Sequence, residues 1–134
     1  MNQSFKIFIF LSTIQYIIDI QIYPCNKLNG HLLLYIHHLV DIYIKFGGFL
    51  FNPLYHLISI VFTIIHWITN NNQCFLTEWV NKVCYPEYIE YIEYKGFNDF
   101  SRMLGLQDKY PDINYYYLFI LIIYDLVKLK LINF

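Results

Sequence analysis

Four long apolar stretches dominate the chain, with polar segments between them. They cover about residues 5–23, 32–51, 53–69 and 113–132. Each approaches the roughly 20 residues that a helix needs to cross a hydrocarbon core about 30 Å thick. The pattern therefore predicts an all-α fold, an integral membrane four-helix bundle in which each stretch is one span.

The N-terminal stretch has a second interpretation, because Lys6 precedes its apolar run as in a signal peptide. No small-residue cleavage site follows before Pro24, so we expect an uncleaved helix. A soluble bundle of buried, apolar helices is the alternative to membrane insertion. Such a bundle needs polar outer faces, and the stretch 113–132 has almost none. Membrane insertion is therefore favoured.

The connections between the stretches predict the topology. Only Asn52 and Pro53 separate the second stretch from the third, so these two stretches form an antiparallel hairpin. We call the side of the hairpin turn side B. Both chain termini then lie on side B, whereas residues 24–31 and 70–112 lie on side A. The lysines near the span ends are balanced between the two sides and do not orient the protein.

The segment 70–112 is expected to form a polar cap on side A. Within it, Leu76, Trp79, Val80 and Val83 recur at helical spacing on one face. This spacing predicts a short amphipathic helix between the third and fourth spans, with Trp79 at the depth of the lipid headgroups. In residues 87–94, acidic side chains recur at every third position of a tyrosine-rich run, which predicts a solvated helical part of the cap.

Composition narrows the function classes. The 134 residues provide one domain, residues 1–134, without room for a second core. Hydrophobic residues make up 57% and charged residues 14%, which is unusual for a soluble domain. A formal net charge of −1 provides no basic surface for phosphates, so nucleic acid is not an expected partner. The lipid bilayer is the expected partner, and the protein is expected to be multi-pass.

Several ionisable residues lie inside the predicted spans, where they are costly unless they face partners or water. Asp19 and Asp125 lie in the outer spans, and the others lie in the central hairpin. Counted from the Asn52 turn at roughly 1.5 Å per residue, His38 and His66 have the same depth. We therefore expect His66 to lie within side-chain reach of His38 or of its neighbour His37.

The second span carries a polar stripe. At about 100° per residue, His37, Asp41 and Gly48 share one face, with Lys45 at its edge. Asp41 either orients the His37 imidazole or is neutralised by Lys45.

Gly47 and Gly48 lie at the depth of His56, and two glycines permit close approach of helices. We expect His56 to pack over Gly48. Alternatively, the glycines serve helix packing alone and His56 hydrogen-bonds a carbonyl.

Three roles suit a cluster of His37, His38, Asp41, His56 and His66. These roles are a ligand or proton pocket, a metal or haem site on His37, His38 and His66, and polar contacts that hold the bundle together. The metal and haem role is disfavoured because no repeated carboxylate-histidine signature is present. The sequence contains no nucleophile-elbow motif and no Gly-rich phosphate loop, so it favours a protein that is not an enzyme.

All three cysteines, Cys25, Cys74 and Cys84, fall on side A. An oxidising lumen there allows one disulfide and leaves one thiol over, and this favours cytosolic termini. Cys25 and Cys74 are separated from the hairpin by about five or six residues each, so we expect Cys74 to lie beside Cys25 or Cys84. The alternative is three unpaired thiols at the membrane surface.

Several short motifs resemble those of a family of small multi-pass membrane proteins known only as a domain of unknown function. That family has a histidine-bearing helix ending in Gly-Gly, a helix with a His-Leu start, and a Cys-Pro-Leu-Thr motif. The matching positions here are His37 or His38, Gly47, Gly48, His56, Cys74, Leu76 and Thr77. The resemblance covers about residues 31–132 and implies a compact membrane unit, to which the first span is an addition. Phe75 replaces the motif's proline, and Val80 stands where the family has a glutamate.

Two function classes follow from these observations. The first is a small multi-pass membrane protein with an intramembrane His/Asp ligand or proton pocket. The second is a structural or assembly protein that acts through its polar cap and helix packing, with another membrane protein or a second copy of the chain as its partner. The resemblance adds no reaction to either class.

Overall fold

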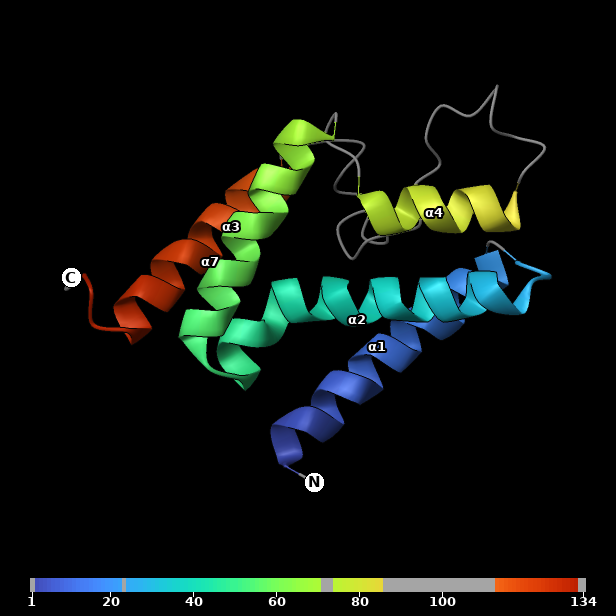
Figure 1. Ribbon diagram of the computed structural model, residues 1–134. Helices are drawn as coiled ribbons and strands as arrows, with labels where there is room; N and C mark the ends of the chain where they lie inside the picture. The colour runs from blue at the N-terminus through green and yellow to red at the C-terminus, as the bar shows by residue number, and fades with distance from the viewer. Residues whose placement is uncertain (1, 23, 71–73, 86–112, 133–134) are drawn as a thin grey trace.

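The computed structural model describes residues 2–22, 24–70, 74–85 and 113–132. Within them the chain forms five helices and no strand, which confirms the all-α prediction for these residues. The helices are α1 (Gln3–Ile22), α2 (Leu28–Leu50), α3 (Pro53–Thr69), α4 (Phe75–Cys84) and α7 (Ile113–Lys128), as Figure 1 shows.

The turn between α2 and α3 is set by local chemistry. Pro53 occupies the first turn of α3, where its missing N–H costs nothing. The Asn52 side chain caps this helix by accepting a hydrogen bond from the Leu54 N–H at 2.9 Å. Because α2 ends at Leu50, only two residues connect the helices, as the sequence predicts.

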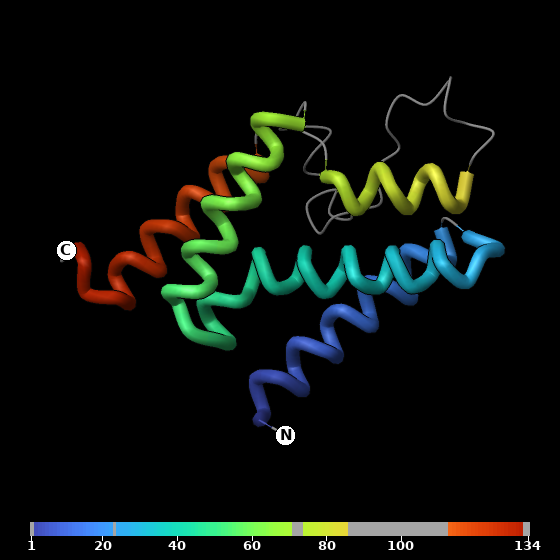
Figure 2. Tube along the Cα trace, viewed as in Figure 1, coloured from blue at the N-terminus to red at the C-terminus, as the bar shows by residue number. Residues whose placement is uncertain are grey.

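The long helix α2 is the centre of the arrangement. It contacts each of the other four helices: α1, α3, α4 and α7. Figure 2 shows α1 and α4 beside the N-terminal half of α2, while α3 and α7 lie side by side at its C-terminal end.

The apolar core is divided into two small clusters. Ile44, Ile60, Leu118 and Leu121 pack together where α2, α3 and α7 meet. Leu34 and Val80 form the second cluster between α2 and α4, with Ile20 of α1 against it.

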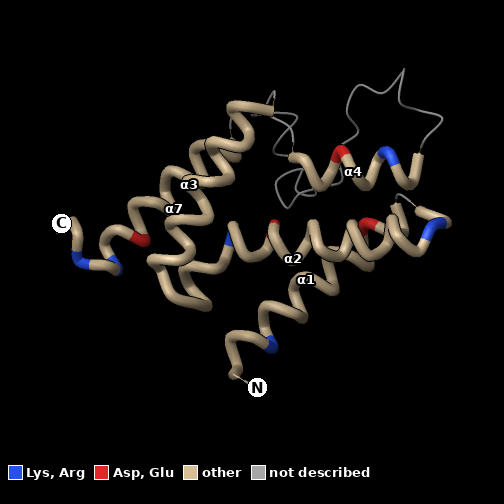
Figure 3. The backbone as a smooth tube through the Cα atoms, viewed as in Figure 1, with Lys and Arg blue, Asp and Glu red and all other residues tan. Residues whose placement is uncertain are grey.

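On these helices, polar side chains are buried and large apolar side chains are exposed. The buried residues of α1 are Ser12, Gln15 and Asp19, all of them polar. Its large apolar side chains point outward instead; Phe10, for example, is 63% exposed. On α3, His56 is buried while Phe62 and Ile68 are each 68% exposed. Figure 3 shows that long stretches of the helices carry no charged residue.

One of the described helices, α1, is long and apolar enough to cross a membrane by length and composition. Only 17% of its apolar window is buried inside the protein. A second apolar helix, α3, is shorter at 17 residues.

Candidate functional site

Buried and half-buried polar groups follow one face of α2 from its middle toward its C-terminal end. His37, Asp41, Lys45 and Gly48 recur at three- and four-residue spacing on this face, which is the stripe that the sequence predicts. Each contacts a polar group from another helix or from α2 itself. We call these four residues and their polar contacts the polar track.

A buried pair next to the track joins α1 to α2. His38 Nε2 lies 3.0 Å from Asp19 Oδ2, and both side chains are completely buried. These two atoms are close enough for an ion pair but are not aligned for a hydrogen bond. The His37 and His38 rings are in edge contact, with centroids 5.4 Å apart.

Five polar atoms of Asp19, His37 and His38 have no hydrogen-bond partner among the described residues. They are both carboxylate oxygens of Asp19, both ring nitrogens of His38 and His37 Nε2. Buried polar atoms in proteins are normally bound to protein or to ordered water. Such a group of atoms is therefore suited to hold a small polar molecule or an exchangeable proton.

Cys74 connects the track to α4. Its Sγ lies 3.7 Å from His37 Nδ1, at the residue that precedes the first turn of α4. Burial raises the pKa of the Cys74 thiol, but the neighbouring His37 imidazole and two backbone amides of α4 together leave the pKa below its ordinary value. These amides belong to Leu76 and Thr77 in the first turn of α4.

The middle of the track is an ion pair. Lys45 Nζ lies 2.8 Å from Asp41 Oδ1, and Gln15 Nε2 of α1 donates to Asp41 Oδ2 at 2.8 Å. Of the two roles that the sequence allows for Asp41, the structure has the one in which Lys45 neutralises it. The Lys45 carbonyl accepts a hydrogen bond from the Tyr117 hydroxyl of α7 at 2.8 Å.

A second buried pair lies at the other end of α2. His56 Nδ1 of α3 is 2.6 Å from Asp125 Oδ2 of α7, and His56 Nε2 is 2.9 Å from the Ile44 carbonyl oxygen. A carbonyl oxygen only accepts, so Nε2 carries a proton, and another proton lies between Nδ1 and Oδ2. The pair therefore holds two protons and is electrically neutral, whichever atom carries the second proton.

Two glycines make room for this pair. A Cβ at Gly48 would collide with Asp125 Oδ1 and lie 2.7 Å from His56 Nδ1. A Cβ at Gly47 would lie 2.7 Å from His56 Cδ2. His56 thus packs over both glycines and also bonds a carbonyl, so the two arrangements that the sequence leaves open coexist. Lys128 Nζ, at the end of α7, donates to the Gly48 carbonyl at 3.1 Å.

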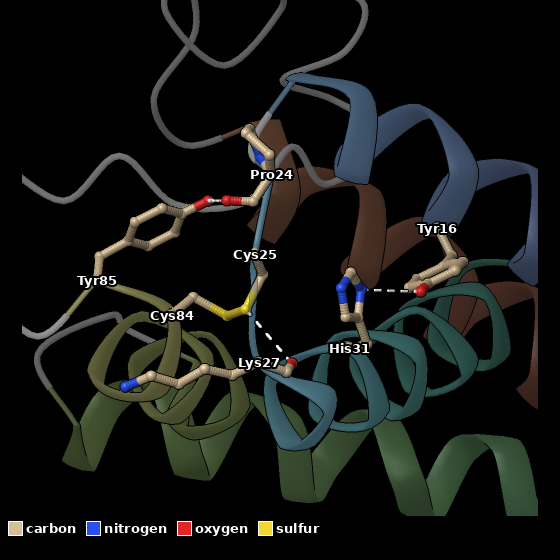
Figure 4. The surroundings of a disulfide bond; sticks show 7 residues. All are labelled: Tyr16, Pro24, Cys25, Lys27, His31, Cys84 and Tyr85. Carbon is tan, nitrogen blue, oxygen red and sulfur yellow. Dashed lines mark hydrogen bonds between the residues drawn. A yellow bond between two sulfur atoms is a disulfide. The ribbon is translucent and has the colours of Figure 1, made fainter.

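The disulfide differs from the expected pairing. Cys25 is bonded to Cys84, with the Cα atoms 5.1 Å apart, and Figure 4 shows the bond between the start of α2 and the end of α4. We expected Cys74 to lie beside Cys25 or Cys84, and this expectation was wrong. Because Cys74 and Cys84 lie at opposite ends of α4, they are about 15 Å apart along the helix axis.

Close packing surrounds the disulfide. A Cβ at Gly30 would collide with the sulfur atoms of both cysteines. The Tyr85 hydroxyl donates to the Pro24 carbonyl at 3.1 Å, also visible in Figure 4. These contacts fasten the end of α4 to the segment that connects α1 and α2.

His66 is the second correction. Its Nε2 accepts a hydrogen bond from the Phe75 N–H at 3.0 Å, and this contact replaces the expected one with His37 or His38. The prediction assumed that α2 and α3 run side by side along their whole length. In Figure 1, α3 leaves the turn at a steep angle to α2, so residues at equal distance from the turn separate. His66 instead caps the first turn of α4.

The motif of the family resemblance lies at the contact of α4 with α2. Thr77 and Val80 are the buried residues of α4, and Leu76 is half-buried. Val80 joins the Leu34 cluster, so an apolar residue fills the position where the family has a glutamate.

Gln15, Asp19 and Asp125 are the polar residues that the sequence did not assign to a site. The sequence feature that could have identified them is their place in apolar helices, where a polar side chain is costly. Their partners come from other helices, at separations of 26, 19 and 69 residues.

A metal site was one expected role of the histidines. In the part of the chain that the structure describes, no three His, Cys, Asp or Glu residues gather as a metal ion requires. The tyrosine-rich part of the cap, 87–94, lies outside the described residues.

Comparisons with protein-family models, with curated proteins and with solved structures found no match to this chain. The family resemblance stays a prediction.

Proposed function

We propose that this chain is a multi-pass integral membrane protein that takes up protons and moves them along the polar track. The observation that carries the proposal is the track itself, a line of buried ionisable groups along α2 inside helices with apolar outer faces. Ionisable side chains within a bilayer typically face the bundle interior and mark ion or proton pathways.

The inverted distribution of residues supports the membrane location. Each of α1, α2, α3 and α7 buries an ionisable residue and exposes large apolar ones: Asp19, His38, His56 and Asp125 are all completely buried. A water-soluble bundle is stabilised by the opposite arrangement. In lipid, the exposed apolar side chains contact acyl chains, and the polar groups find partners inside the bundle.

Helix length is compatible with four spans. At 1.5 Å per residue, α2 is about 35 Å long, and α3 and α7 are each about 25 Å long. The shorter two suit a thin bilayer. Residues 5–23, 32–51, 53–69 and 113–132 are therefore the proposed spans, with both termini on side B in the cytosol.

The outer face of α4 supports a position at the membrane surface. Phe75 and Trp79 are each about half exposed, and their rings are in contact at 4.8 Å. Glu78 and Lys82 form an exposed ion pair on the same helix. Aromatic residues beside charged ones are typical of a helix at headgroup depth.

The track provides a series of ionisable groups along α2. It begins at Cys74 and His37, includes the Asp41–Lys45 ion pair, and ends near the His56–Asp125 pair, which binds the carbonyl of Ile44, the residue before Lys45. The unpartnered atoms of Asp19, His37 and His38 are the proposed place where a proton or water molecule is held.

The topology is tested by labelling introduced cysteines from one side of intact vesicles, in a chain where Cys74 is replaced by serine. A label placed at Ser4 is expected to react from side B, and one placed at Asn70 from side A. If an impermeant reagent on one side labels both positions, the four-span scheme is wrong.

Proton movement is tested in vesicles that contain a trapped pH-sensitive dye. Wild-type protein is expected to speed the decay of an imposed pH gradient, and Asp41→Asn to slow this decay at least about tenfold, as expected for loss of a proton-transfer group. Glu78→Gln is the matched control, since Glu78 is a half-buried carboxylate outside the track. Wild-type vesicles as tight as empty ones would contradict proton movement.

The His56–Asp125 pair favours the second function class in one respect. Both nitrogens of His56 are hydrogen-bonded, and this arrangement stabilises packing and leaves no ring nitrogen for a ligand. A protein that conducts no protons but loses stability in Asp41→Asn would be a structural or assembly protein, whose partner is another membrane protein or a second copy of the chain.

A further inference from the structure

Cys74 has chemistry that the proton track does not use. It precedes α4 outside the proposed spans, and it is a thiol while the other two cysteines form the disulfide. His37, which contacts it, is only 7% exposed. The Sγ–Nδ1 distance of 3.7 Å allows the ring nitrogen to exchange a proton with the sulfur.

The His37 ring offers a second and independent observation. Its other nitrogen, Nε2, is buried and has no hydrogen-bond partner among the described residues. Nδ1 is therefore the ring nitrogen with a described polar neighbour, and that neighbour is sulfur. A buried imidazole directed at a thiol beside a helix N-terminus is the environment in which cysteines become nucleophilic.

We propose that Cys74 and His37 form a reactive pair that exchanges with low-molecular-weight disulfides, such as glutathione disulfide, to give a mixed disulfide on Cys74. The Cys74 thiolate attacks one sulfur of the glutathione disulfide. A Cys74–glutathione S–S bond forms, and the glutathione S–S bond breaks. The leaving glutathione thiolate takes the proton that His37 received from Cys74. Cys74 is thereby oxidised, one glutathione is reduced, and no other reactant is needed.

The choice of a disulfide as reactant follows from the position of α4. Cys25–Cys84 persists at the far end of this helix, so both ends of α4 face the same, oxidising compartment. The most abundant partners of a thiolate there are disulfides. Exchange with Cys84 itself is excluded by the separation of about 15 Å along α4.

The polar and charged groups described near Cys74 have partners of their own. His66 of α3 binds the backbone N–H of the next residue, Phe75. Glu78 lies one turn further along α4 and is paired with Lys82. His37 is the side chain that contacts the Cys74 sulfur directly and acts on its reactivity.

The experiment treats the full chain in detergent with oxidised glutathione near pH 6 and follows mixed-disulfide formation by mass spectrometry. Wild-type protein is expected to gain one glutathione on Cys74, and Cys74→Ser none. His37→Asn is expected to react about tenfold more slowly at pH 6 and to recover at pH 9, where a thiol ionises unaided. His66→Gln, at the adjacent contact, is the matched control and is expected to react as wild type.

The remaining outcomes overturn the proposal. These are a Cys74 that resists glutathione disulfide, an equal rate in His37→Asn at pH 6, or a product in which two chains are joined through Cys74. An unchanged circular dichroism spectrum in each variant shows that the fold is retained. The readout needs no membrane gradient, so the result is independent of proton movement.

Discussion

His56 and Asp125 join α3 to α7 through a buried contact of 2.6 Å between Nδ1 and Oδ2. The two residues are 69 positions apart in the sequence, and neither side chain is exposed. The pair lies against Gly47 and Gly48, so α2 approaches it without any intervening side chain. Three of the four proposed spans therefore meet at this point.

Removing either member of this pair is expected to destabilise the bundle. His56→Leu leaves the Asp125 carboxyl buried without its partner, at a cost of about 3–5 kcal/mol in the free energy of unfolding. Asp125→Leu is expected to cost a similar amount. Because the two share one contact, the double variant is expected to be more stable than the sum of the single effects predicts.

Unfolding in detergent, followed by circular dichroism, measures these differences. Tyr55→Leu, at an exposed neighbour of His56, is expected to change stability by less than about 0.5 kcal/mol. Strictly additive single and double variants would show that the contact contributes nothing specific.

Gly48→Ala tests the close approach of α2 to the pair. The added methyl group meets Asp125 and His56, so a loss of about 1–3 kcal/mol is expected from overpacking. In an Asp125→Ala background part of the space is open, and the same change is expected to cost less. Thermal unfolding measures the loss of stability that Gly48→Ala causes in each background. Equal losses would show that the added methyl group does not clash with Asp125.

The Cys25–Cys84 disulfide closes a separation of 59 residues. Replacing both cysteines with serine is expected to lower stability by about 4 kcal/mol, the loop-closure entropy for a loop of this length. The end of α4 is then expected to detach from α2, and proteolysis at Lys82 to accelerate. Non-reducing mass spectrometry is expected to show the Cys25–Cys84 peptide pair, with Cys74 alkylated; a Cys25–Cys74 pair would contradict the structure.

The lowered pKa of the Cys74 thiol makes stability depend on pH. The folded protein holds the thiolate more readily than the unfolded chain, whose thiol pKa is near 9.0. This contribution is fully present above pH 9.0 and is lost as pH falls through the lowered pKa of the folded state. The wild-type melting temperature is therefore expected to fall relative to that of Cys74→Ser as pH is lowered through this window.

The sequence by itself determined the helices and the residues that must be buried. Asn52 and Pro53 set the turn because a capping amide and a proline act within a few residues. The spacing of His37, Asp41 and Gly48 placed them on one face because helix geometry is local. The cost of burying charge marked these residues and the others of the track as requiring partners.

Only the tertiary structure decided which partners they have. Counting residues from the turn placed His66 beside His38, but this count holds only for helices that run side by side. The crossing of two helices depends on how their surfaces pack, and here His56 lies over Gly47 and Gly48. The choice of Cys84 over Cys74 for the disulfide likewise depends on the direction in which α4 lies along α2. Both are set by contacts between residues distant in sequence, which local periodicity does not encode.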